Sequence, residues 1–335
     1  MILITGGAGF IGSHTAIELL NYGNRVMILD NLSNSNADII PCIEKITGCK
    51  VSFIKGDIRD KNLLQAIFTQ YPIDIVVHFA ALKAVGESVT KPLEYYDNNV
   101  AGSLSLIEAM QAANVTCMVF SSSATVYGNP AEIPISENCP IGHPTNPYGQ
   151  SKGMSEKILT DLHRADPRWS IALLRYFNPV GAHASGLIGE SPNGIPNNLM
   201  PYINQVATGK LQQLSVYGND YDTPDGPGIR DYIHVVDLAE GHVKACDYIQ
   251  NKQGIHVWNL GTGKGYSVLE VIRAFEAETG QKIRFKISPR RAGDIAKCWA
   301  NCQKAEKELN WQAKRDLKAM VHDSWRSQCH HEQQK

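Results

Sequence analysis

A tyrosine and a lysine four residues apart form the pair in this sequence best suited to proton chemistry. Tyr148 follows Asn146 and Pro147, a favourable helix cap and a favourable first helical residue. Tyr148 and Lys152 are therefore expected one turn apart on the same helix face. A free tyrosine, with a pKa of about 10, is a poor base at neutral pH. The Lys152 ammonium and the positive end of the helix dipole would favour the phenolate, which could accept a hydroxyl proton.

Three serines follow a strand that we expect at 118–120. Ser121, Ser122 and Ser123 should then lie at the carboxyl edge of a sheet. Ser123 could hydrogen-bond the reacting oxygen beside Tyr148. Simple capping of a turn is the alternative role for these hydroxyls, and we expect it of Ser121 or Ser122 more than of Ser123.

Four glycines form a loop at the start of the chain, directly after the apolar run 2–4. Gly6, Gly7, Gly9 and Gly12 give both the G-x-G-x-x-G and the G-x-x-G-x-x-G spacing, and residues with helical spacing follow. Residues without a Cβ allow a sharp turn and a close approach to a pyrophosphate, whose charge then lies at a helix N-terminus. A tight turn that binds nothing is the alternative.

An acid at the end of the next strand indicates which dinucleotide would bind. Asp30 closes the run 25–29, eighteen residues after Gly12, where a carboxylate can accept hydrogen bonds from ribose hydroxyls. It would repel a 2′-phosphate, and 31–36 hold no Lys or Arg to neutralise one. The sequence therefore predicts NAD as the cofactor. A nicotinamide beside Tyr148 could take a hydride from the carbon whose hydroxyl loses its proton.

Alternating apolar runs and helical patterns predict an α/β fold, a Rossmann-type doubly wound parallel sheet. Further strands are expected at 50–54, 74–80, 117–120 and 170–176, and helices at 100–113 and 147–165. Beyond Asn178, proline and glycine become frequent, and we expect short, irregular elements there. We predict an NAD-binding domain at 1–177 and a smaller mixed α/β substrate-binding lobe at 178–335, some segments of which return to the first domain.

The bulk composition excludes several classes of function. The chain has 335 residues, 43% of them apolar and 19% charged, and a net charge of −1, which attracts it to neither nucleic acid nor membrane. No apolar stretch approaches about twenty residues, and Met1 runs directly into the first strand, so we expect no targeting segment. The eight scattered cysteines suit reduced thiols and a cytoplasmic location, and no metal site is expected.

Together these motifs resemble the extended short-chain dehydrogenase/reductase superfamily, and within it the UDP-sugar 4-epimerases. The resemblance covers essentially the whole chain. It rests on residues 5–12, 29–32, 56–58, 78–88, 95–100, 121–128, 146–152, 174–182, 195–201 and 228–235.

The resemblance implies a set of site residues. NAD would be bound by Gly6, Gly9, Phe10, Ile11, Gly12, Asp30, Asn31, Asp57, Ile58, Phe79, Ala80, Lys83, Asn98, Tyr148, Lys152 and Phe177. The UDP-sugar would be bound by Lys83, Ser123, Tyr148, Asn178, Asn198, Leu199, Tyr217, Arg230, Tyr232, Arg291, Asp294 and Cys298, with Tyr148, Lys152 and Ser123 catalytic.

The same resemblance implies individual roles. Asp57 and Ile58 would flank the adenine, and Tyr217 would lie against the uracil. Arg230 and Arg291 would bind the diphosphate, because guanidinium groups bind phosphate oxygens bidentately. A structural ion pair, with Asp231 or Asp294 as partner, is the alternative for either arginine.

The choice within the superfamily depends on two positions. Nucleotide-sugar dehydratases carry an Asp-Glu pair where this sequence has Ala124 and Thr125, which cannot supply their acid and base. The prediction is reversible C4 epimerisation through a 4-keto sugar, with tightly bound NAD that is recycled. A non-catalytic dinucleotide-binding regulator remains as a further alternative, against which the intact Tyr148 and Lys152 argue.

The substrate range and the assembly are also expectations from the resemblance. In relatives, the residue that corresponds to Cys298 borders the hexose pocket near C2 of the sugar. A tyrosine there narrows the pocket, whereas a cysteine is much smaller. Cys298 could therefore admit N-acetylated UDP-sugars, with simple packing as the alternative. The alternative prediction is a dedicated UDP-N-acetylglucosamine 4-epimerase. Relatives pair as homodimers through helices that correspond to 93–113 and 148–165.

Overall fold

A seven-stranded parallel sheet forms the larger part of the computed structural model, which describes residues 1–335 except 143, 193, 195, 292 and 334–335. The strand order is β10-β6-β5-β4-β1-β2-β3, and every neighbouring pair is parallel. The strands are β1 (Ile2–Thr5), β2 (Val26–Asp30), β3 (Ser52–Lys55), β4 (Ile75–His78), β5 (Cys117–Ser123), β6 (Ser170–Tyr176) and β10 (Gly254–Leu260).

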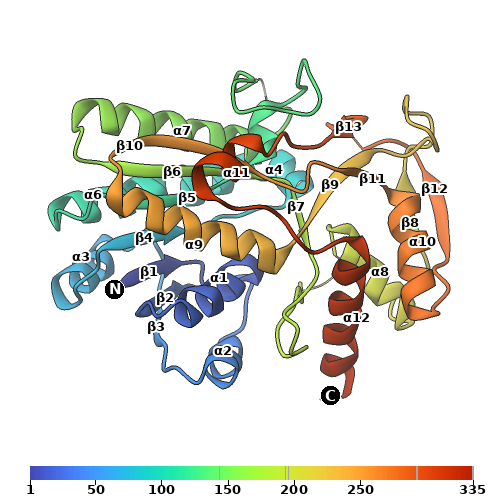
Figure 1. The fold of residues 1–335 in the computed structure, drawn as a ribbon, viewed down its shortest axis with the longest axis horizontal. Coiled ribbons are helices and arrows are strands. Elements are labelled where there is room, and N and C mark those ends of the chain that lie inside the picture. Colours follow the sequence, from blue (N-terminus) through green and yellow to red (C-terminus); the bar gives the residue numbers. More distant parts are fainter. Residues whose placement is uncertain (143, 193, 195, 292, 334–335) are drawn as a thin grey trace.

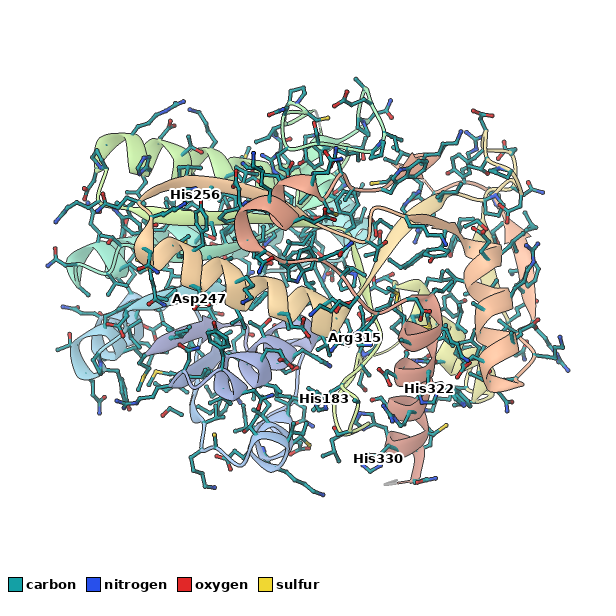
Figure 2. All side chains as sticks on the ribbon, viewed as in Figure 1. His183, Asp247, His256, Arg315, His322 and His330 are labelled. Atoms are coloured by element: carbon teal, nitrogen blue, oxygen red, sulfur yellow. The ribbon has the colours of Figure 1, made fainter. Side chains whose placement is uncertain are left out.

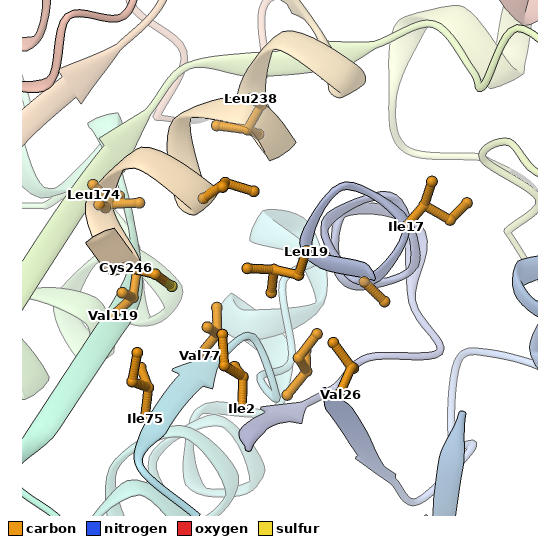
Figure 3. Close-up of a cluster of buried hydrophobic side chains, with 14 of the residues drawn as sticks. Ile2, Ile17, Leu19, Val26, Ile75, Val77, Val119, Leu174, Leu238 and Cys246 are labelled. Atoms are coloured by element: carbon orange, nitrogen blue, oxygen red, sulfur yellow. The ribbon is translucent and has the colours of Figure 1, made fainter. Parts of the chain in front are cut away.

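Successive side chains of a strand point to opposite sides, so the apolar residues of these strands are divided between the two faces of the sheet. Ile2 and Ile4 of β1 belong to one buried cluster, and Leu3 between them belongs to another. Figure 3 shows the first cluster, in which Ile2 and Val77 lie opposite Leu19 and Leu238. Burial on both sides confirms the prediction from the short, continuous apolar runs.

Helices cover both faces of this sheet (Figure 1). The helices α1 (Phe10–Asn21), α2 (Ile39–Thr47), α9 (Val235–Asn251) and α11 (Gln303–Leu309) contribute to the cluster of Figure 3. The helices α3 (Lys61–Gln70), α6 (Gly102–Ala112) and α7 (Pro147–Ala165) contribute to the other. The fold is therefore the predicted doubly wound Rossmann-type α/β architecture.

The order of the strands reverses between β1 and β4. The chain runs from β1 to β2 and β3 on one side, then crosses to β4, β5 and β6 on the other. At such a switch point the loops leaving adjacent carboxyl ends diverge and open a crevice. The glycine loop after β1 and the segment after β4 therefore lie where a ligand of this fold is expected.

A second, smaller unit has its own sheet and core. The strands β7 (Asn178–Val180), β9 (Ile229–His234), β11 (Gly265–Ser267) and β13 (Lys297–Cys298) form one sheet, and β8 (Leu214–Tyr217) pairs with β12 (Phe285–Ser288). The helices α8 (Leu199–Ala207), α10 (Val268–Thr279) and α12 (Leu317–Gln333) pack around Met200, Ile203, Phe275 and Met320.

The chain after residue 178 is less irregular than its composition predicts. The expectation of short elements is wrong beyond Val235, because α9, α10 and α12 have 17, 12 and 17 residues. The glycines and prolines that suggested irregularity gather in 179–196 and 218–228, between the elements. Residues 235–260 return to the large sheet as α9 and β10, and β10 pairs with β6 along its whole length.

The C-terminal segment is fastened to the large unit by a buried carboxylate. Asp237 on α9 accepts hydrogen bonds from the backbone of Lys314 (3.1 Å) and Arg315 (2.8 Å) and contacts the Arg315 guanidinium. Arg315, labelled in Figure 2, also pairs with Glu240 at 3.1 Å. This contact sets the position from which α12 enters the smaller unit.

Candidate active site

Gly6 and Gly12 in the loop after β1 are packed too tightly to be replaced by residues with a side chain. Gly6 has a φ of +71°, and a Cβ there would lie 2.6 Å from the Ala80 backbone nitrogen. A Cβ on Gly12 would collide with the Gly6 carbonyl, whereas one on Gly9 would meet only that carbonyl, at 3.3 Å. The loop thus lies against the segment after β4 and opens α1 at Phe10 and Ile11. This bare-backbone cradle at a helix N-terminus suits a pyrophosphate.

Asp30 joins the loop to the end of β2. Its buried carboxylate accepts hydrogen bonds from the Ala8 amide (3.0 Å), the Leu32 amide (2.9 Å) and the Ser35 hydroxyl (2.9 Å). A carboxylate has about four acceptor positions, so capacity remains for a ribose hydroxyl. The loop and Asp30 together fit NAD.

The predicted adenine-flanking residues follow β3, the strand that pairs with β2. Asn31 donates to Asp57 at 3.0 Å, and Arg59 binds Asp57 through two nitrogens at 2.9 and 2.8 Å. The hydrogen bonds from Arg59 hold the pKa of Asp57 well below its usual range. Ile58 is buried beside Gly102. Arg59 is a contact that the sequence analysis missed, although its spacing of two from Asp57 was visible.

Strand β5 extends further than predicted, through all three serines. Ser121 bonds with the Tyr176 hydroxyl, and Ser122 donates to Glu156 at 2.5 Å. Ser123 instead caps the short 3-10 turn Ala124–Tyr127, accepting from the Thr125 amide at 3.2 Å. The expectation that Ser121 or Ser122 caps a turn is therefore wrong, because both lie within the strand.

Helix α7 brings the predicted proton-transfer pair to the end of β5. It begins as predicted, with Asn146 as N-cap accepting from the Gly149 amide at 2.9 Å and Pro147 in the first turn. Lys152, 4% exposed, donates to the Ser121 carbonyl at 2.7 Å and lies 4.9 Å from the centre of the Phe120 ring. Tyr148, Lys152 and Ser123 therefore meet at one strand end.

Burial opposes the charged form of both members of this pair. It lowers the pKa of Lys152 to about 7, with the Glu156 carboxylate opposing this shift. It raises the pKa of Tyr148, with hydrogen bonding to Ser123 acting in the other direction. The phenolate therefore needs the positive charge of Lys152 and of an oxidised nicotinamide close by.

A buried ion pair, missed by the sequence analysis, supports this region. Arg175 on β6 binds Glu156 on α7 at 3.0 and 2.6 Å and the Tyr127 hydroxyl at 3.1 Å. Glu156 also accepts the Ser122 hydroxyl bond. These hydrogen bonds connect α7 to β5 and β6 one helical turn after Lys152. They therefore fix the position of α7 relative to the sheet.

Three of the other predicted cofactor residues directly follow β4 or β6, and Asn98 lies on a helical segment. Phe79 and Ala80 follow β4, and the Phe79 ring lies 4.8 Å from that of His242. Asn98, 8% exposed, is held by a 2.9 Å bond to Asn99 in one turn of π-helix at Asp97–Ala101. Phe177, after β6, is buried in the same cluster as Cys298.

Lys83 and Asn198 meet at a carboxylate that the sequence analysis did not identify. Glu190 pairs with the Lys83 ammonium at 3.2 Å and accepts from the Asn198 amide at 2.6 Å. Lys83 lies beyond β4 of the large unit, whereas Asn198 precedes Leu199, the first residue of α8 in the smaller unit. Glu190 thus joins two predicted ligand residues across the two units.

Most of the remaining predicted substrate residues form a second group around Asp294. Arg291 pairs with Asp294 at 3.0 Å, and Arg230 approaches it at 3.8 Å. The Arg291 guanidinium also lies 4.8 Å from the centre of the Tyr217 ring. Asp231, the other suggested partner, is no partner of either arginine in the described chain: it accepts bonds from Thr262, Gly263 and Ala300.

Strand pairing places three more of the predicted residues. Asn178 on β7 lies opposite Tyr232 on β9, and Cys298 on β13 lies opposite Arg230 on β9. Cys298 is 9% exposed, and burial raises its pKa to about 11, so it is a neutral thiol at physiological pH. Ile195, part of the stretch 195–201 used above, lies outside the described residues.

Two further findings concern the described part of the chain. Its His, Cys, Asp and Glu side chains form no group of three or more that could hold a metal ion. None of its helices combines the length and the apolarity needed to cross a membrane.

Known proteins match this chain over nearly its whole length. The sequence family described as GDP-mannose 4,6 dehydratase matches residues 3–324. A UDP-glucose 4-epimerase of Neisseria meningitidis serogroup A is 60% identical over 325 residues, which are 97% of this chain and 96% of that protein.

Solved structures give the same result. A UDP-glucose 4-epimerase from Bifidobacterium longum, in complex with NAD+ and UDP, superimposes with a TM-score of 0.96 at 57% identity and covers 98% of each chain. One from Stenotrophomonas maltophila, with bound NAD and formylated UDP-arabinopyranose, gives a TM-score of 0.97 at 49% identity and covers 100% of this chain and 99% of that one.

Proposed function

The chain belongs to the UDP-glucose 4-epimerase family of extended short-chain dehydrogenases/reductases, and from this membership we propose the following account of its activity. It is an NAD-dependent enzyme that interconverts UDP-glucose and UDP-galactose by inverting C4 of the hexose. The observation that carries this function is the meeting of Tyr148, Lys152 and Ser123 beside a dinucleotide-binding loop.

The protein residues handle the proton and hold the sugar. Tyr148 accepts the proton of the 4-hydroxyl, Lys152 stabilises the resulting phenolate, and Ser123 hydrogen-bonds the reacting oxygen. NAD held by the glycine loop and Asp30 would supply reversible hydride transfer at C4 of the hexose. Arg230 and Arg291 retain the diphosphate while the 4-keto sugar turns its other face, after which Tyr148 gives the proton back. The seven-stranded unit binds NAD and the smaller unit binds the UDP-sugar.

The residues beside Ser123 argue against a dehydratase, even though the matching sequence family carries that description. Ala124 and Thr125 form the start of the 3-10 turn after β5. Thr125 donates its hydroxyl hydrogen to Ser123 at 3.0 Å, and Ala124 has no group that could transfer a proton. Elimination of water would need an acid and a base at this place.

The direct test uses purified protein with no added NAD. UDP-galactose and UDP-N-acetylgalactosamine are incubated separately and the products resolved by NMR. Conversion of UDP-galactose supports the epimerase with retained NAD. Failure of both substrates to react, even after NAD is supplied, would instead favour a dehydratase or a non-catalytic dinucleotide binder.

We also propose that the enzyme accepts N-acetylated UDP-sugars. Cys298 is small, lies in one buried cluster with the predicted cofactor residue Phe177, and is paired with Arg230 at the predicted diphosphate site. A tyrosine at this position would fill the space that an acetyl group needs. Cys298→Tyr should abolish turnover of the acetylated sugars and retain that of UDP-galactose, with the exposed Cys49→Tyr as control. Unchanged turnover of both sugars would contradict this role of Cys298.

Retention of NAD is a further part of the proposal. The overall reaction is redox-neutral, and the glycine loop, Asp30 and Asp57 provide an extended site. Protein denatured after purification should release close to one NAD per chain. Cofactor-free protein that consumes NADH stoichiometrically would contradict a recycled cofactor.

We propose a homodimer that pairs through the helical face formed by α4 (Val85–Thr90), α5 (Pro92–Tyr96), α6 and α7. Leu93 is 80% exposed, and Val89, Leu104 and Met154 are also exposed on these helices. Large exposed apolar side chains gathered on neighbouring helices are typical of an interface. Light scattering should give the mass of two chains, and Leu93→Glu should give that of one. A wild-type monomer at assay concentration would contradict the dimer.

The cytoplasm is the proposed location. All eight cysteines are free, as expected where thiols are kept reduced. Fractionation of cells that produce the protein, followed by detection in each compartment, tests this assignment.

A further inference from the structure

Glu190 contacts residues of both the large and the smaller unit. It directly follows a compact loop in which His183 and Ile188 are joined by a 3.2 Å backbone bond and Ala182 bridges to Gly189. Ile188 is fully buried in the core of the large unit. The backbone that carries Glu190 is therefore anchored to the core of the large unit through Ile188.

Within the described residues, only one of the two carboxylate oxygens of Glu190 has hydrogen-bond partners. Oε1 accepts from the Lys83 ammonium at 3.2 Å and from the Asn198 amide at 2.6 Å. Oε2 is buried and has no hydrogen-bond partner among the residues that the structure describes. The whole side chain is only 9% exposed. Leaving a buried acceptor unpaired costs free energy, so a position like this is expected where a ligand supplies the donor.

The side chain of Asn198 bonds to Glu190 and not to the helix that it precedes. It stands at the N-cap of α8, where an asparagine normally bonds a backbone amide of the first turn. Its side chain makes no such bond and instead donates to Glu190. Glu190 thus orients a residue predicted to contact the sugar nucleotide, together with Lys83.

The chemistry of a carboxylate restricts what can approach Oε2. An ionised carboxylate only accepts hydrogen bonds and repels phosphate oxygens. Both ligands of the proposed function, NAD and the UDP-sugar, offer hydroxyl donors on their sugar rings. The diphosphate has a separate site of opposite charge at Arg230 and Arg291.

We propose that Glu190 binds a sugar hydroxyl with Oε2 while Oε1 positions Lys83 and Asn198, which makes it a ligand-binding residue of this site. The hydroxyl comes from the hexose of the substrate or from a ribose of the cofactor. The inference rests on the proposed function, whose ligands supply these hydroxyls.

Two substitutions test the role. Glu190→Ala removes both contacts, and Glu190→Gln keeps the size of the side chain but not its second acceptor. The exposed Glu306→Ala on α11 is the matched control. For each protein we would measure the KM for UDP-galactose, the inhibition constant of UDP, which lacks the hexose, and the NAD released per chain. Melting temperatures verify folding.

The two sources of the hydroxyl give different results. With a hexose hydroxyl, Glu190→Ala raises the KM for UDP-galactose about ten- to a hundredfold and leaves the inhibition constant of UDP unchanged. With a ribose hydroxyl, the NAD content falls, and added NAD restores activity at the wild-type KM. In both cases Glu190→Gln shifts the same quantity less.

Two outcomes would overturn the inference: equal changes in the KM for UDP-galactose and the inhibition constant of UDP, or no change in these two quantities and the NAD content. Glu190 would then have only a structural role in its loop. Binding of UDP and UDP-galactose can also be compared by calorimetry without turnover. The role of Glu190 is therefore tested even if wild-type protein fails to epimerise, a result that would contradict the proposed function alone.

Discussion

Lys152 and Tyr148 lie where burial alone would favour their uncharged forms. Lys152 has a pKa lowered to about 7, and the pKa of Tyr148 is raised. The sequence predicts both residues because their helix spacing is local. It does not predict Glu190, whose partner Lys83 lies 107 positions away. Only the folded chain brings such distant residues together.

Removal of one hydroxyl should separate proton transfer from binding. Tyr148→Phe keeps the ring and loses the group that takes the 4-hydroxyl proton. We expect kcat to fall by at least about a hundredfold, a typical contribution of general acid–base catalysis, while UDP affinity is retained. Steady-state kinetics and calorimetry measure the two quantities, with Tyr71→Phe as control. A kcat close to wild type would contradict the assignment of Tyr148.

At the scale of elements, helix α7 positions the catalytic groups through its first turn. The sequence signals for this helix are all local, namely Asn146 as cap, Pro147 in the first turn and the spacing that follows, and the observed bounds agree with them. The end of β5 was predicted less well. Serines give no apolar signal, so the strand seemed to end at Phe120, although its pairing with β6 carries it to Ser123.

The cap of this helix should influence both stability and turnover. Asn146→Ala leaves the Gly149 amide without its partner and should lower the free energy of unfolding by about 1 kcal/mol. Because Tyr148 lies in the same turn, kcat should fall as well, with little change in the inhibition constant of UDP. Asn146→Asp retains a capping oxygen and should restore both properties. Chemical denaturation and kinetics of the three proteins provide the measurements.

At the scale of the whole molecule, three fully buried histidines make folding sensitive to acid. Burial lowers the pKa of His14 and of His78 to about 3 and that of His242 to about 4. The Nδ1 of His14 bonds the Phe10 carbonyl at 2.7 Å, and its Nε2 has no partner among the described residues. Each ring is therefore neutral in the folded protein, whereas the unfolded chain binds protons below a pH of about 6.5.

Stability should consequently fall as the pH drops below about 6.5. At pH 5 each such histidine lowers the free energy of unfolding by about 2 kcal/mol relative to neutral pH, because its folded-state pKa is the lower one. Urea unfolding at pH 7.5 and pH 5 measures the loss. His14→Asn should reduce it by about 2 kcal/mol, and the exposed His322→Asn serves as control. An equal loss in His14→Asn and wild type would contradict the argument.

The return of the chain to its first sheet has a consequence for biosynthesis. All seven residues of β6 are buried, and β10 covers the edge of β6 from Ser170 to Tyr176. A nascent chain that has left the ribosome only as far as β6 lacks both β10 and α9. It must carry an open, apolar strand edge until Leu260 emerges, and such edges invite aggregation. Chaperone demand should therefore peak in that interval, and nascent chains stalled before Gly254 should be far more protease-sensitive than chains stalled after the C-terminal helix has emerged.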